Sequence, residues 1–146
     1  MPVIPTQHLE PLAPLVGRWR TSGAVFDEHG NTQTHLAGTD VYDWLPGGHW
    51  IAHDVDVTMG DQRVLVHELI GGVHPAGGWQ MHAFDAADSP GVMRLSLEEP
   101  GLLLLRGNGV RSWLRIRAEE SNMTALWERE VGNSWLTWME VRFQRA

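Results

Sequence analysis

Apolar and polar residues alternate along most of this chain, which is the pattern of β-strands that bury one face. The segment 110–118 shows it clearly, because Leu114 and Ile116 share one face while Arg115 and Arg117 share the other. An arginine face belongs in water, so the opposite face points toward a core. Strong helical periodicity is absent, and the alternation predicts an all-β protein.

Turn-forming residues divide this pattern into ten segments. Glycine, proline, asparagine and aspartate stand between the apolar stretches, for example at Pro46-Gly47, at Gly60-Asp61 and around Pro90. Such short connections predict that each strand pairs antiparallel with the next one. The predicted strands are 17–26, 32–44, 49–59, 62–71, 79–85, 92–98, 102–107, 110–118, 123–130 and 135–144.

One helix candidate precedes the first strand, over residues 6–16. Thr6 is a residue type that caps helix N-termini, while Pro11 and Pro14 keep the helix short. The predicted strands 62–71 and 102–107 are apolar on both faces, and this helix or a second subunit is expected to cover their outer face.

Ten short strands in an open sheet would leave two unpaired edges and an apolar face in contact with water. Closing the sheet removes the edges and buries one face inside. We therefore predict a single domain over residues 1–146, an antiparallel up-and-down closed β-barrel of about ten strands. A lead-in segment, 1–16, contains the short helix, and the strands leave no room for a second domain.

Composition and charge limit the classes of partner that the protein can bind. The formal net charge is −7, which disfavours nucleic acid, because Lys and Arg must neutralise its phosphates. The chain has no cysteine, which excludes disulfides and thiolate metal sites. Its first residues have neither the positive region nor the apolar run of a signal peptide, and no apolar run approaches the ~18 residues of a membrane helix. We expect a cytoplasmic protein that binds no membrane.

The function of a closed barrel depends on what its lumen holds, so the inward faces are the candidate site. Apolar side chains that share the inward faces of three predicted strands form the expected cavity wall. They are Ile51, Val55, Val57, Leu114, Ile116, Met139, Val141 and Trp135. Apolar walls of this kind favour a small hydrophobic molecule as the partner.

A few polar side chains could orient such a molecule. His53 lies mid-strand on an apolar face between Ile51 and Val55, and a buried histidine there is expected to be mainly neutral at pH 7. Tyr42 and His67 are further candidates, with ordinary packing as the alternative for Tyr42.

Eight histidines raise the question of a metal site. His49 and His53 would converge on a helix, but on a strand they lie about 13 Å apart at roughly 3.3 Å per residue. One ion with ligands at about 2 Å cannot bind both. A site would need histidines from adjacent strands, such as His53, His67 and His82. We predict no metal.

Three pieces of the sequence resemble a known family in the same order. They are the lead-in to Gly17-Arg18-Trp19, the stretch from Gly38-Thr39 through Trp44-Leu45-Pro46-Gly47-Gly48, and His82-Ala83-Phe84-Asp85. Together they resemble a bacterial, lipocalin-like family, domain of unknown function 1579. The resemblance implies a calycin barrel and supplies no established activity.

The resemblance also bears on single residues. It favours His82 inside the barrel, where alternation alone leaves the direction open. In lipocalins an arginine of the last strand covers the tryptophan of the Gly-x-Trp motif, which implies Arg145 over Trp19 here. Related nitrobindin barrels hold haem through a histidine near the C-terminus. The last strand of this chain has none, and Met139 is a poor substitute, so we expect no haem and no other cofactor.

Three functions stay open at this point. The first is binding of a small, largely apolar molecule in the lumen. The second is a barrel enzyme (an isomerase, cyclase or hydrolase) in which His53 or His82 is the general base. The third is a structural barrel with a filled lumen that works through its surface, and apolar outer positions leave a homodimer open.

Overall fold

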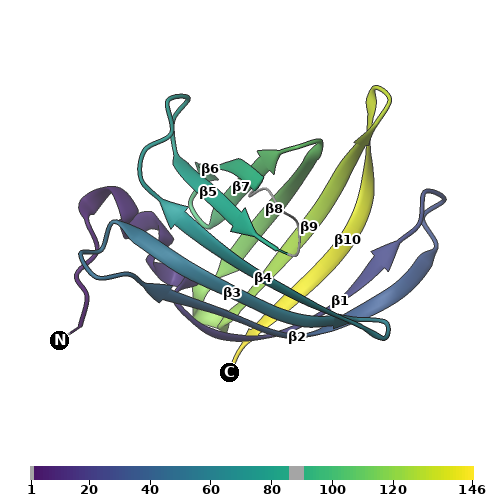
Figure 1. Cartoon of the computed structure of the whole chain (residues 1–146), viewed down its shortest axis with the longest axis horizontal. Helices are drawn as coiled ribbons and strands as arrows, with labels where there is room; N and C mark the ends of the chain where they lie inside the picture. The colour runs from purple at the N-terminus through teal and green to yellow at the C-terminus, as the bar shows by residue number, and fades with distance from the viewer. Residues whose placement is uncertain (1, 86–90) are drawn as a thin grey trace.

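The computed structural model describes residues 2–85 and 91–146, which form a closed ten-stranded antiparallel barrel (Figure 1). Each strand pairs with its neighbour in sequence, and β1 pairs with β10 to close the ring. The predicted all-β barrel is therefore confirmed. The strands are β1 (Gly17–Phe26), β2 (Thr32–Trp44), β3 (Trp50–Met59), β4 (Gln62–Gly71), β5 (Trp79–Phe84), β6 (Gly91–Glu99), β7 (Leu102–Gly107), β8 (Val110–Arg117), β9 (Asn122–Val131) and β10 (Ser134–Arg145).

The strand ends predicted from the turn residues agree closely with those in the structure. Strands β1, β2, β4 and β7 begin and end at the predicted residues, and the others differ by a single residue at one or both ends. The turn predicted around Pro90 lies outside the described residues. A short 3-10 segment, η2 (Ala118–Glu120), precedes β9.

The lead-in helix closes one end of the barrel. It is a 3-10 helix, η1 (Gln7–Leu15), that buries Leu9, Leu12 and Leu15 against the strands (Figure 1). Two internal prolines each remove a backbone donor, which suits a short helix. Thr6 occupies the N-cap position as predicted, but its side chain makes no capping hydrogen bond. No helix in the described ranges is long and apolar enough to cross a membrane.

The closed end is held by Trp19 and Arg145. The Arg145 guanidinium lies 4.1 Å from the centroid of the Trp19 ring, and it donates hydrogen bonds to the carbonyls of Val16 and Pro14. The indole of Trp19 donates to the carbonyl of Leu15 at 2.9 Å. The prediction that Arg145 covers Trp19 is confirmed. Gly17 has φ +142°, and a Cβ there would meet Arg145 Nη1 at 2.2 Å, so this position needs glycine.

The strand pleat decides which side chains face the lumen. In β4, where alternation leaves the facing open, Val66 and Glu68 border the lumen, while Leu65 is exposed on the outer face. In β10 the alternation breaks at a bulge between Thr137 and Met139. Such a bulge reverses the facing of the residues that precede it.

Candidate functional site

The barrel lumen contains a cavity of about 230 Å³, and Leu15 at the end of η1 is part of its lining. A dry cavity of about 150 Å³ with an apolar lining is known to hold benzene, so this volume suits a molecule on the order of nine non-hydrogen atoms. Most of its wall is apolar. The lining includes Leu15, Leu36, Val55, Val57, Met59, Val64, Val66, Ile70, Met81, Leu95, Leu105, Leu114, Ala125, Trp127, Met139, Val141 and Phe143.

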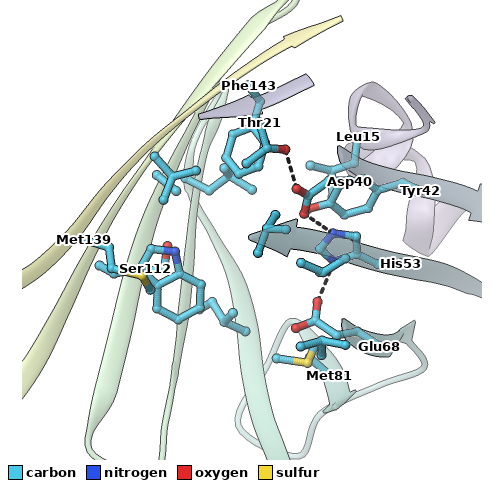
Figure 2. A pocket seen from close by; sticks show the side chains of 18 of the residues that line it. Leu15, Thr21, Asp40, Tyr42, His53, Glu68, Met81, Ser112, Met139 and Phe143 are labelled. Carbon is cyan, nitrogen blue, oxygen red and sulfur yellow. Dashed lines mark hydrogen bonds and ion pairs between the residues drawn. The ribbon is translucent and has the colours of Figure 1, made fainter. Parts of the chain in front are cut away.

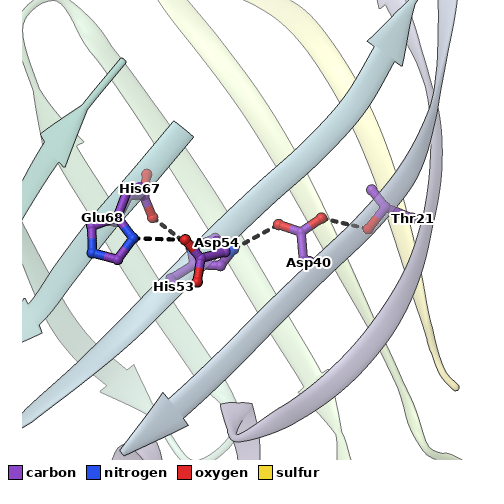
Figure 3. Close-up of polar contacts among 6 residues, drawn as sticks. All are labelled: Thr21, Asp40, His53, Asp54, His67 and Glu68. Atoms are coloured by element: carbon purple, nitrogen blue, oxygen red, sulfur yellow. Dashed lines mark hydrogen bonds and ion pairs between the residues drawn. The ribbon is translucent and has the colours of Figure 1, made fainter. Parts of the chain in front are cut away.

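One wall of the cavity carries a continuous line of polar side chains (Figure 2). Thr21 Oγ1 donates to Asp40 Oδ1 at 2.5 Å. His53 Nε2 lies 2.6 Å from Asp40 Oδ2, and His53 Nδ1 lies 2.6 Å from Glu68 Oε1. The four residues come from the consecutive strands β1, β2, β3 and β4, so the line crosses the wall from strand to strand (Figure 3).

The register of the strands brings these groups together. His53 on β3 stands directly opposite Glu68 on β4 and directly opposite Tyr42 on β2. Directly opposed residues have Cβ atoms about 4.5–5.5 Å apart, which brings an imidazole within reach of a carboxylate. Asp40 is two residues from Tyr42 on the same face of β2 and therefore reaches the other ring nitrogen.

His53 is a buried cation rather than a neutral base. Burial acts to lower its pKa, but the negative charge of Glu68, the hydrogen bonds to Asp40 and Glu68, and the charge of Asp40 outweigh burial and raise the pKa from 6.5 to about 9. The expectation of a mainly neutral His53 at pH 7 is wrong, because it did not include two carboxylates. At neutral pH both ring nitrogens carry a proton and donate to the carboxylates.

Tyr42 packs against the face of the His53 ring. The two rings stack with centroids 3.8 Å apart and planes within 9° of each other. Burial, followed by the charges of Asp40 and Glu68, raises the pKa of Tyr42 well above its usual value, so its hydroxyl stays protonated. Both rings line the cavity, as expected from the sequence.

The opposite wall is mainly apolar. β8 lies across the ten-stranded ring from β3, and Figure 2 shows Ser112 and Met139 facing the polar line from the far side. Ser112 is buried and borders the cavity. Its hydroxyl forms no side-chain hydrogen bond within the described part of the chain, and a molecule in the cavity can reach it.

Two predicted histidines lie outside the barrel. His82 contacts Gln80 Oε1 at 2.8 Å and packs against Trp50, while its neighbour Met81 lines the cavity. His67 is exposed and pairs with Asp54 at 2.6 Å (Figure 3). The inward expectations for His82 and His67 are therefore wrong. The strand pleat explains both positions, because successive side chains of a strand point to opposite faces. His82 follows the inward Met81, and His67 follows the inward Val66.

The apolar wall was predicted in part. Val55 and Met139 line the cavity, and Ile51 is fully buried in the core but does not border the cavity. Trp135 is on the outer face, where the Arg111 guanidinium lies 4.2 Å from its ring centroid. Its predicted inward direction is wrong, because the β10 bulge lies between Trp135 and Met139.

The prediction missed the carboxylates. Asp40 and Glu68 complete the polar line, and neither was singled out from the sequence. A signal was present, since Glu68 shares the inward face of β4 with Val64, Val66 and Ile70. A carboxylate on an apolar face requires a partner, and the strand register supplies His53.

These side chains do not suit a metal or a haem iron. Among residues 2–85 and 91–146, no group of three or more His, Cys, Asp or Glu side chains is arranged to hold a metal ion. Asp40 and Glu68 contact opposite nitrogens of His53, so they do not converge on a common point. Because both nitrogens contact carboxylates, His53 has no free nitrogen for an iron ligand, and the site does not fit a histidine-bound haem.

Comparisons with known proteins support the fold alone. A scan against protein-family models finds no match, and a search of curated proteins also finds none. Among solved structures, the chain is similar to Rv2717c from M. tuberculosis, with 14% identity, a TM-score of 0.56, and coverage of 98% of this chain and 99% of that one. This likeness shows a shared barrel fold. It does not extend to the family that the sequence motifs resemble.

Proposed function

We propose that this protein binds a small, largely apolar molecule in the barrel lumen. The observation that carries the proposal is the cavity of about 230 Å³, with an apolar lining and one polar wall. Apolar surface supplies affinity, and a few fixed polar groups supply orientation. Asp40, His53 and Glu68 hold each other in place and therefore form a rigid polar contact.

The alternative of a general base at His53 has less support. A general base needs a lone pair within reach of the substrate proton. Both nitrogens of His53 face carboxylate oxygens at 2.6 Å, and its pKa near 9 keeps the ring protonated at neutral pH. His82, the other predicted base, is on the outer face. The cavity also favours binding over a filled structural barrel.

We further propose that this is a lipocalin-like barrel and that it works in the cytoplasm. The Gly17-Arg18-Trp19 motif supports the first part, because Arg145 covers Trp19 at the closed end in the way the resemblance implies. A homodimer remains a proposal whose test is the mass of the protein in solution.

Filling the lumen tests the proposed function. Val66 lines the cavity, whereas its neighbour Leu65 is 55% exposed on the outer face. Calorimetric titration with 2-phenylethanol should show binding to the wild type and to Leu65→Phe, and a loss of about tenfold or more in Val66→Phe. Val64→Phe repeats the test at a second lining position if Val66→Phe does not fold. Unchanged binding in a folded lumen-filled variant would contradict the proposal.

Native mass spectrometry of freshly purified protein extends this test to the natural ligand. A co-purifying small molecule should be present on the wild type and on Leu65→Phe, and absent from Val66→Phe. A molecule that is retained equally by all three would be bound outside the lumen.

A further inference from the structure

The hydrogen bonds of the polar line leave one carboxylate oxygen free. Asp40 uses Oδ1 for Thr21 and Oδ2 for His53, and Glu68 uses Oε1 for His53. Within the described residues, the hydrogen bonds of the Glu68 side chain involve Oε1 alone. Glu68 borders the cavity with its side chain 15% exposed, and Figure 2 shows its second oxygen turned away from His53. The lumen therefore contains a carboxylate oxygen that can accept a hydrogen bond from a ligand.

The charges on this wall do not cancel. Asp40 and Glu68 bring two negative charges, and His53 brings one positive charge between them. Among the described residues that line the cavity there is no arginine. An anionic ligand would add a second net negative charge inside the barrel, whereas a cationic ligand would neutralise the first.

We propose that the lumen ligand is an amine, whose protonated nitrogen donates to Glu68 Oε2 while its apolar body occupies the rest of the cavity. This inference rests on the proposed function and specifies the class of ligand. His53 is then a positioning residue, because it holds Glu68 through Oε1 and does not touch the ligand nitrogen. An apolar carboxylate, such as a short fatty acid, is disfavoured by the same site.

The test compares three probes of similar shape that differ in their polar end. They are 2-phenylethylamine, 2-phenylethanol and phenylacetate, titrated calorimetrically into the wild-type protein near neutral pH. The amine should bind about tenfold or more tightly than the alcohol, and phenylacetate should bind most weakly, since a hydrogen bond to a charged group exceeds one between neutral groups. This order of affinities needs no substitution and so does not depend on the folding of a variant.

A substitution at Glu68 locates the effect. In Glu68→Gln the amide oxygen still accepts from His53 Nδ1, which turns the amide NH₂ toward the lumen and replaces an acceptor by a donor. The amine should lose about tenfold or more in affinity, the alcohol should change by about twofold or less, and phenylacetate should bind more tightly than before. Glu140→Gln, the same chemical change on the outer face of β10, should leave all three affinities unchanged.

The outcomes separate the two proposals. If the alcohol binds but phenylacetate binds as tightly as the amine, or if Glu68→Gln leaves the amine affinity unchanged, the amine inference is wrong and lumen binding stands. If none of the three probes binds the wild type, the proposed function fails and the inference fails with it.

Discussion

His53 Nδ1 lies 2.6 Å from Glu68 Oε1. This contact makes the histidine part of a wall rather than a free base, because the other ring nitrogen is held by a second carboxylate. The roles of the two residues in the site therefore differ. Glu68, which still has an oxygen open to the cavity, becomes the residue that meets a ligand, and His53 becomes the residue that fixes its position.

The charge on His53 predicts a loss of stability in mild alkali. Its pKa is about 9 in the fold against 6.5 as the ordinary value, so its contribution is complete below about pH 6.5 and is lost as the pH rises through about 9. The free energy of unfolding should fall by on the order of 3 kcal/mol between about pH 6 and about pH 9.5. Urea unfolding across this range measures it.

The control for this prediction is the exposed His67. His67→Gln should keep the pH dependence of the wild type, because His67 lies on the outer face with Asp54. Tyr42 does not interfere, since its pKa is raised above the range studied. NMR titration of the His53 ring reports its protonation directly, and a midpoint near 6.5 would contradict a histidine that is charged at neutral pH.

Removal of the cation should destabilise the barrel strongly. His53→Gln leaves the buried Asp40 and the partly buried Glu68 as two carboxylates with no positive partner; breaking a buried pair typically costs about 3–5 kcal/mol. Adding Asp40→Asn and Glu68→Gln to His53→Gln should recover part of this loss, because the repulsion disappears. If the triple variant is no more stable than His53→Gln alone by chemical unfolding, the electrostatic explanation is wrong.

Thr21 anchors the far end of the polar line. Thr21→Val keeps the shape of the side chain but removes the donor to Asp40 Oδ1, and it should lower the free energy of unfolding by about 1–3 kcal/mol. Thr39→Val, on the outer face of β2, is the matched change and should have an effect within about 0.5 kcal/mol. Equal effects in urea unfolding would show that the Thr21–Asp40 hydrogen bond contributes little.

Arg145 holds the closed end of the barrel together. Arg145→Ala loses the contact with the Trp19 ring and two hydrogen bonds to the carbonyls of Val16 and Pro14. The expected destabilisation is on the order of 3 kcal/mol. Arg142→Ala, an exposed position on the same strand, should change stability by about 0.5 kcal/mol or less. Similar unfolding midpoints for the two variants would contradict a structural role for Arg145.

Strand bounds and closure could be predicted because local sequence determines them. Glycine and proline turns mark the strand ends, and a period of two gives the facing of regular strands such as β8. The same rule failed at Trp135, since a bulge is a property of the pairing between β9 and β10 and has no clear local signature.

The polar line could be predicted only in part. His53 was recognised as a buried polar group on an apolar face, but its partners come from β2 and β4. The identity of these partners depends on the register between strands, and the charge of His53 depends in turn on the partners. For His82 the prediction relied on the family resemblance, which favoured an inward direction. The pleat of β5 directs this side chain outward instead.

The structure of the protein with 2-phenylethylamine bound tests the central claim most directly. We predict the amine nitrogen within hydrogen-bond distance of Glu68 Oε2, with the ring in the lumen between Val66 and Leu114. A probe bound on the outer face, or one in the lumen with its nitrogen turned away from Glu68, would contradict this claim.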